Sequence, residues 1–215
     1  MGENLKNQPL EFEKAVCALM EQDYCILDDF LDPSDTQGLL DALQQKQQSN
    51  PFKPAGIGRG TELQHNPAIR GDEIMWLENN ETEARIRRLL DKVEGMIAYF
   101  NQSCYAGIRD YEAHFAIYPP QAYYHLHLDQ FQGSGHRRYT FIFYLNFDWK
   151  VEHGGCLRIH PGPRDGGTVI DIAPVAGRFV CFRSNAIPHE VLVTHRHRYS
   201  VTGWWLNQEK TLGFL

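Results

Sequence analysis

The sequence predicts a mainly β protein, a sandwich or a barrel, supported by helices on its N-terminal side. Residues 10–110 carry apolar side chains mostly at helical spacing, with a few strand-like runs between them. In residues 111–207, short runs rich in β-branched and aromatic residues alternate with Gly and Pro, which is typical of a sandwich or barrel. Since 215 residues suit one hydrophobic core, we expect a single domain over 1–215.

The N-terminal part predicts three helices and two strands. The first helix shows an apolar stripe at positions i, i+4, i+7 and i+8, formed by Phe12, Val16, Leu19 and Met20. Asp32 and Pro33 are the usual N-cap and first residue of a helix, which continues through Leu39, Leu40 and Leu43. The third helix is predicted by Ile86, Leu89, Leu90, Val93, Met96, Ile97 and Phe100. The runs 24–27 and 74–77 predict strands.

A long loop and six further strands complete the prediction. Residues 49–67 contain several Pro and Gly without periodicity, so we expect a mobile loop there, either a lid over a site or a plain connector. The six predicted strands are 112–118, 139–146, 156–160, 168–172, 178–183 and 199–206.

Net charge, cysteine content and hydropathy indicate which partners and which cellular compartment to expect. The formal net charge is −6, which argues against nucleic-acid binding, and residues 195–198 form the only dense basic run. The five cysteines are odd in number and lack C-x-x-C spacing, which favours free thiols in a reducing cytoplasm. The polar residues 1–8 show no signal peptide, and no apolar run reaches membrane-spanning length. We therefore expect a cytoplasmic protein without a membrane or nucleic-acid partner.

The segment His125-Leu126-His127-Leu128-Asp129 offers metal ligands. Side chains two apart in a strand share a face, so either His127 with Asp129 or His125 with His127 can point at one ion. His189 follows a later predicted strand and adds another imidazole. Two imidazoles and one carboxylate form the facial arrangement that suits non-haem iron(II). Three protein ligands leave three octahedral positions, two for a bidentate 2-oxo acid and one for dioxygen.

Arg198 extends this site. It lies nine residues after His189, at the start of a strand whose alternation places Arg198, Ser200, Thr202 and Trp204 on one face. A guanidinium binds a carboxylate with two parallel hydrogen bonds, which a lysine does not. A buried Arg198 needs an anion, which is either a bound dicarboxylate or a structural Asp or Glu.

Seven features occur in order along the chain: Arg70-Gly71-Asp72-x-Ile74-x-Trp76, Tyr118-Pro119, Tyr124-x-x-His127-x-Asp129, Tyr144-Leu145-Asn146-x-Asp148-Trp149, Gly154-Gly155-x-Leu157-Arg158-Ile159-x-Pro161, Pro188-His189-Glu190-Val191 and Arg198-Tyr199-x-x-Thr202-x-Trp204. In order and spacing, this pattern resembles the 2-oxoglutarate oxygenases of the prolyl-hydroxylase type. The likeness is greatest to the catalytic domain of the hypoxia-inducible factor prolyl hydroxylases and their bacterial relatives, over about residues 70–206.

The resemblance implies a double-stranded β-helix, or jelly roll, over 111–207, with helical support over 10–110. It implies a dioxygenase that uses iron(II), 2-oxoglutarate and dioxygen, with ascorbate as an optional supporting reductant. The products are succinate, carbon dioxide and a hydroxylated prolyl residue in a protein substrate, such as a regulatory protein or a component of the translation apparatus.

The resemblance also implies roles for particular residues. The iron ligands are His127, Asp129 and His189. Arg198 and the Tyr144 hydroxyl bind the distal carboxylate of 2-oxoglutarate. The other residues of the co-substrate pocket are Tyr118 and Thr202. The substrate side comprises Tyr124, Trp204 and Arg70.

The chain departs from the family at a few positions, and alternatives stay open. Arg183 stands where a tryptophan is usual, and His125-Leu126 replaces the usual residues before the metal histidine. We expect His125 to lie on the surface or beside the ligands rather than on the metal. The alternatives are a cupin-type metalloprotein with His125, His127 and His189 on the metal, a non-catalytic binding module, and the same oxygenase chemistry on a small metabolite.

Overall fold

A computed structural model describes residues 4–49, 52–56, 65–66, 68–78, 80–130, 136–162 and 167–208. Its helices are α1 (Asn4–Gln22), α2 (Pro33–Ser49), α3 (Ala84–Cys104) and the 3-10 turn η2 (Val151–His153). Its strands are β1 (Tyr24–Leu27), β2 (Lys53–Pro54), β3 (Glu73–Leu77), β4 (Asp110–Tyr118), β5 (Tyr124–His127), β6 (Arg137–Tyr144), β7 (Leu157–Ile159), β8 (Ile170–Ile172), β9 (Phe179–Arg183), β10 (His189–Val191) and β11 (Arg198–Leu206).

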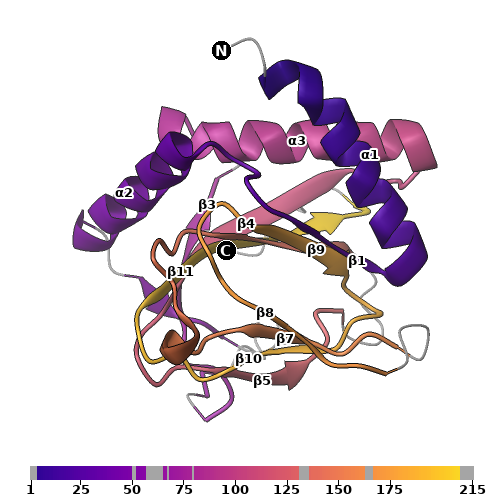
Figure 1. The fold of residues 1–215 in the computed structure, drawn as a ribbon. Helices are drawn as coiled ribbons and strands as arrows, with labels where there is room; N and C mark the ends of the chain where they lie inside the picture. The colour runs from indigo at the N-terminus through magenta and orange to yellow at the C-terminus, as the bar shows by residue number, and fades with distance from the viewer. Residues whose placement is uncertain are drawn as a thin grey trace.

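The strands form two sheets that face each other. The larger sheet has the order β1-β9-β6-β11-β4-β3-β2, and the smaller has the order β5-β10-β7-β8. All of the strand pairs that the structure describes within these sheets are antiparallel. The three α-helices cover the outer face of the larger sheet, and the smaller sheet lies against its inner face (Figure 1). This confirms the predicted jelly-roll class with supporting helices.

Alternation along the central strands separates two apolar cores. On β4, Phe115 and Ile117 face the helices, whereas Ala116 and Tyr118 face the smaller sheet. The same alternation runs through β6 and β11. β11 lies between β6 and β4, and its register against each of them is continuous over most of its length. The inner face of the larger sheet therefore presents its side chains to the space between the sheets, where the candidate site lies.

The close packing of β11 between β4 and β6 requires a glycine at position 203. A Cβ on Gly203 would lie 2.4 Å from Cζ of Phe141 and 2.4 Å from the carbonyl oxygen of Glu112. Its neighbours Thr202 and Trp204 both line the cavity on the inner face, so the glycine lets β11 pack closely between β4 and β6.

Most of the predicted elements occur where expected. β1 spans the predicted 24–27, and α2 begins at Pro33. One residue of the α1 stripe is wrongly predicted, because Met20 is 57% exposed while Phe12, Val16 and Leu19 are buried.

Three short strands, β2, β5 and β10, are not among the predicted strands, although the candidate metal ligands in residues 125–129 were expected to lie on a strand. β2 falls inside the expected loop 49–67, which lies in part outside the described residues. A strand of two to four residues has too little periodicity to recognise, so its pairing partner defines it.

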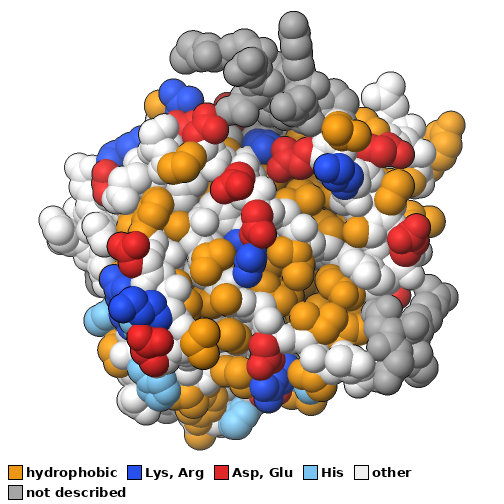
Figure 2. Space-filling model, in the orientation of Figure 1, with side chains coloured by type: hydrophobic (Ala, Val, Ile, Leu, Met, Phe, Trp, Pro, Cys, Tyr) orange, Lys and Arg blue, Asp and Glu red, His pale blue; other side chains and the backbone are white. Residues whose placement is uncertain are grey.

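The described surface carries charges of both signs (Figure 2). Acidic and basic side chains are interspersed on the face shown in Figure 2, without a continuous basic patch there. The basic run 195–198 is interrupted in space, because Arg198 is buried while the three residues before it are exposed. Of the helices that the structure describes, none has the length and apolarity needed to cross a bilayer.

Candidate active site

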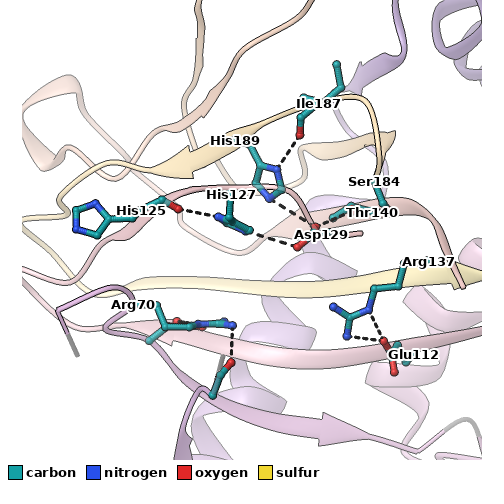
Figure 3. A network of polar contacts seen from close by, with 12 residues as sticks. Arg70, Glu112, His125, His127, Asp129, Arg137, Thr140, Ser184, Ile187 and His189 are labelled. Carbon is teal, nitrogen blue, oxygen red and sulfur yellow. Dashed lines mark hydrogen bonds and ion pairs between the residues drawn. The ribbon is translucent and has the colours of Figure 1, made fainter. Parts of the chain in front are cut away.

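Three side chains converge at the end of the smaller sheet (Figure 3). Nε2 of His127 lies 3.5 Å from Oδ1 of Asp129, and Nε2 of His189 lies 3.5 Å from Oδ2. One ligand atom from each of the three lies within 4.8 Å of the others. The pairing of β5 with β10 places His127 opposite His189. This set of two imidazoles and one carboxylate fits iron(II).

Backbone carbonyls orient both imidazoles. Nδ1 of His127 donates to the carbonyl oxygen of His125 at 2.7 Å, and Nδ1 of His189 donates to that of Ile187 at 3.1 Å. A carbonyl can only accept, so Nδ1 carries the proton in both rings. Nε2 of each ring then has a free lone pair that faces Asp129, as a metal ligand requires.

Burial and neighbouring charges set the protonation states of the cluster. Burial, together with the nearby His127, lowers the pKa of His189 to about 4, so this imidazole is neutral near pH 7. Burial acts to raise the pKa of Asp129, but the adjacent imidazoles of His189 and His127 outweigh it, and the net pKa lies well below its usual value. The cluster therefore has a neutral imidazole and a carboxylate ready to bind a cation.

Thr140 fixes the carboxylate, and the sequence analysis did not identify it. Its Oγ1–H donates to Oδ2 of Asp129 at 2.7 Å, and its oxygen lies 2.9 Å from Oγ of Ser184. From the sequence, His127 and Asp129 were expected to share one face of a strand. Asp129 lies beyond the end of β5, so strand alternation does not explain its position beside His127. Thr140 could have been found from its spacing in β6, because it shares a face with Tyr144.

A cavity of about 630 Å³ opens beside the triad. Of the ten predicted site residues, nine line it: His127, Asp129, His189, Arg198, Tyr118, Thr202, Tyr124, Trp204 and Arg70. Tyr144 is fully buried beside Arg198, whose Cζ lies 5.0 Å from the centre of its ring. His125 is exposed, and its ring contacts Tyr123 and points away from the triad, as expected (Figure 3).

Several buried polar atoms beside the cavity lack a hydrogen-bond partner among the described residues. Nη2 of Arg198 and the hydroxyl of Tyr144 are both buried without a hydrogen bond. Arg198 is 1% exposed, and its Nε donates to the carbonyl oxygen of Gly155 at 2.9 Å. Burial raises the pKa of Tyr144, so its hydroxyl stays protonated and able to donate. Two unpartnered donors in a buried pocket fit a carboxylate of a bound dicarboxylate.

Two of the sequence motifs serve to hold Arg198. A Cβ on Gly155 would lie 3.2 Å from Cδ of Arg198, and its φ of +65° favours glycine. The Asn146 amide donates to the carbonyl of Tyr199 at 3.0 Å, and its oxygen accepts from the Tyr199 amide at 2.7 Å. These contacts fix the beginning of β11 and with it the guanidinium.

The mouth of the cavity is aromatic and charged. Arg137 pairs with Glu112 at 2.7 Å, and its Cζ lies 3.5 Å from the centre of the Trp204 ring. The His114 ring contacts both Trp76 and Trp204, with ring centroids at 5.0 and 5.4 Å. Burial, followed by the charges of nearby arginines, lowers the pKa of His114 to about 3, so it is neutral.

These features are those of a 2-oxoglutarate-dependent iron oxygenase, and comparison with known proteins agrees. The model of the 2OG-Fe(II) oxygenase superfamily matches residues 113–206. Prolyl hydroxylase EGLN3 of Mus musculus is 31% identical over 94% of this chain and 86% of its own length. The chain belongs to the 2OG-Fe(II) oxygenase superfamily and, within it, to the prolyl hydroxylases. Members of this family use iron(II), 2-oxoglutarate and dioxygen.

Two solved structures are similar over most of the chain. A Pseudomonas putida prolyl-4-hydroxylase is 31% identical with a TM-score of 0.82, over 92% of this chain and 99% of that chain. A prolyl hydroxylase from Trichoplax adhaerens, solved with a hypoxia-inducible factor peptide fragment, is 26% identical with a TM-score of 0.86, over 96% and 94%. The comparisons do not favour the cupin, binding-module and small-metabolite alternatives.

The departure at Arg183 lies away from the cavity. Its Nε forms an ion pair with Asp23 at 2.9 Å, and its amide donates to the carbonyl of the same residue. Arg183 is not among the residues that line the cavity, so this departure leaves the candidate site intact.

Proposed function

We propose that this protein hydroxylates a prolyl residue in a protein substrate and converts 2-oxoglutarate and dioxygen to succinate and carbon dioxide. The observation that carries the proposal is a cavity lined by a two-histidine, one-carboxylate triad and by Arg198, with unpartnered donors on Arg198 and on the adjacent Tyr144. The names of the similar proteins support prolyl hydroxylation.

We assign the iron to Nε2 of His127, Nε2 of His189 and the carboxylate of Asp129. Arg198 and Tyr144 bind the distal carboxylate of 2-oxoglutarate, and Tyr118 and Thr202 enclose it. The bound iron and 2-oxoglutarate supply the oxidative chemistry, in which one oxygen atom of dioxygen goes to the substrate and the other to succinate. The protein supplies the orientation of the ligands and a pocket that excludes water.

We assign the substrate to the mouth of the cavity, next to Tyr124, Trp204 and Arg70. A partly exposed aromatic surface suits the ring of a proline and the flat backbone around it. A peptide complex is known for the similar Trichoplax adhaerens enzyme, which supports a polypeptide over a small metabolite.

The cellular setting follows from the same sequence properties. All five cysteines are free, which supports a reducing cytoplasm. The net charge of −6 supports a protein substrate rather than a nucleic acid. We treat residues 1–215 as one oxygenase unit, with 111–207 as the jelly-roll core.

The test starts with the purified protein and iron(II) under anaerobic conditions. Titration with 2-oxoglutarate is expected to give a weak visible charge-transfer band that neither component shows alone, and replacing His127 or Arg198 is expected to abolish it. Mass spectrometry of proline-containing candidate proteins after incubation in air then identifies the substrate by a gain of one oxygen atom. Metal binding without the band overturns the use of 2-oxoglutarate.

A further inference from the structure

His127 is the most exposed of the three candidate ligands. Its side chain is 17% exposed, against 8% for Asp129 and 5% for His189. It is the last residue of β5, which is an edge strand of the smaller sheet. His189 lies inside the same sheet between β5 and β7, and its ring contacts Phe182 with centroids 4.6 Å apart. His127 therefore needs another support to keep one ring orientation.

Tyr124 supplies this support. Its ring is stacked on the His127 imidazole, with centroids 3.7 Å apart and planes 18° apart. Cζ of Arg70 lies 4.4 Å from the centre of the Tyr124 ring. A guanidinium over an aromatic ring is attractive, and it stacks well because it is planar. Tyr124 thus contacts the candidate metal ligand and a cation at the same time.

Arg70 is itself held firmly. Its Nε donates to Oδ1 of Asp72 at 2.7 Å and its Nη2 to Oδ2 at 2.6 Å, and Asp72 is buried. Nη1 also donates to the carbonyl oxygen of Gly56 at 3.3 Å. Burial lowers the pKa of Arg70, but the hydrogen bond and charge of Asp72 outweigh it, so the guanidinium stays charged.

The backbone around Arg70 runs along the free edge of β5. Arg70 and Tyr124 form an isolated antiparallel bridge, and the Gly71 amide donates to the carbonyl of Tyr123 at 3.0 Å. The His125 amide donates to the carbonyl of Ile69 at 2.9 Å. The segment that carries Arg70 therefore fixes the strand that carries His127, both through its backbone and through the stacked side chains.

We propose that Arg70 and Tyr124 are positioning residues for the metal, because they hold the His127 imidazole in the orientation that coordination requires. This inference rests on the proposed function and gives these two residues a role other than contact with the substrate. Contacts that orient a metal-binding histidine typically change metal affinity 10- to 100-fold when removed. The effect is present without any peptide, which separates it from a role in substrate binding.

The test measures binding of Mn(II) to the full chain by the loss of the electron paramagnetic resonance signal of free Mn(II), without peptide. Tyr124→Leu is expected to weaken Mn(II) binding roughly 10- to 100-fold, because the stacked ring is lost. Tyr124→Phe keeps the ring and is expected to bind within about threefold of the wild type. Arg70→Lys keeps the charge but loses the planar guanidinium that stacks on Tyr124 and bonds both oxygens of Asp72. We expect Mn(II) binding to weaken roughly 3- to 10-fold.

Tyr123→Leu is the matched control, because Tyr123 lies on the same edge and contacts His125 rather than a ligand. It is expected to bind Mn(II) like the wild type. Equal binding by wild type and the Tyr124→Leu and Arg70→Lys variants overturns the proposal, as does an equal loss in the Tyr123→Leu control. If Tyr124→Leu does not fold, as judged by circular dichroism, the Mn(II) affinities of Arg70→Lys and Tyr124→Phe are compared instead. Equal affinities of these two variants then overturn the proposal. A wild-type protein that binds no Mn(II) contradicts the proposed function instead.

Discussion

Arg198 carries a buried positive charge, and this leads to an unusual prediction about stability. Its side chain is 1% exposed, and it forms no ion pair with any residue that the structure describes. Its Nε donates to the carbonyl oxygen of Gly155, and its Nη2 has no hydrogen-bond partner among the described residues. An uncompensated buried charge destabilises a folded protein, so a neutral side chain of similar size at this position should stabilise the metal-free form.

The magnitude follows from the contacts that are lost and gained. Relief of an uncompensated buried charge is worth about 3–5 kcal/mol. Arg198→Met loses the bond to Gly155 and leaves its carbonyl unpaired, which costs about 1–3 kcal/mol. We therefore expect the free energy of unfolding of the metal-free variant to rise by about 2 kcal/mol. The same variant should no longer bind 2-oxoglutarate.

Urea unfolding in the presence of a chelator measures the first effect. The second is measured with Mn(II) present in every sample, where adding 2-oxoglutarate at about 100 times its Kd should further stabilise the wild type by about 2.7 kcal/mol and leave the variant unchanged. Arg178→Met is the control, because Arg178 pairs with Asp28 at 2.6 Å near the surface and should lose up to about 1 kcal/mol. The reasoning is refuted if metal-free Arg198→Met is less stable than the wild type, or if 2-oxoglutarate stabilises both proteins equally.

Three further predictions concern the surroundings of the site. Thr140→Val keeps the shape but removes the bond to Asp129, so isothermal titration should show Mn(II) binding weakened about 10- to 100-fold, whereas Ser184→Ala should change it by less. The folded pKa of His114 is depressed, so its contribution to stability is present above pH 6.5 and is lost as the pH falls from 6.5 towards 3. Urea unfolding in the presence of a chelator measures this effect. Lowering the pH from about 7.5 to about 5 should reduce the free energy of unfolding of the wild type by about 2 kcal/mol more than that of His114→Phe, and equal losses contradict the burial argument. Gly203→Ala should lower the free energy of unfolding by about 3 kcal/mol, because its Cβ would meet Phe141 and the Glu112 backbone, and a thermal midpoint within a degree of the wild type contradicts the packing.

The sequence predicted the elements whose periodicity is long enough to read. α3 carries six buried residues at helical spacing, and the alternation in β4, β6 and β11 places opposite faces against two different cores. It missed short strands, and it was wrong about burial where the burial of a side chain depends on residues distant in the sequence. Met20 fits the α1 stripe by spacing yet is 57% exposed, because its sulfur lies 3.9 Å from Nη2 of Arg183 near the surface and not in the apolar core.

The sequence by itself predicted the chemistry of the candidate site. The residue types and spacing of His127, Asp129, His189 and Arg198 indicate the ligand types and the anion partner, because these are properties of side chains and their separation along the sequence. The resemblance to the family was needed to choose Asp129 over His125 as a ligand. Only the tertiary structure decided what surrounds them. Thr140 reaches Asp129 from β6, and Tyr124 and Arg70 meet beside His127, because strand pairing brings residues from distant segments together and no local pattern records such contacts.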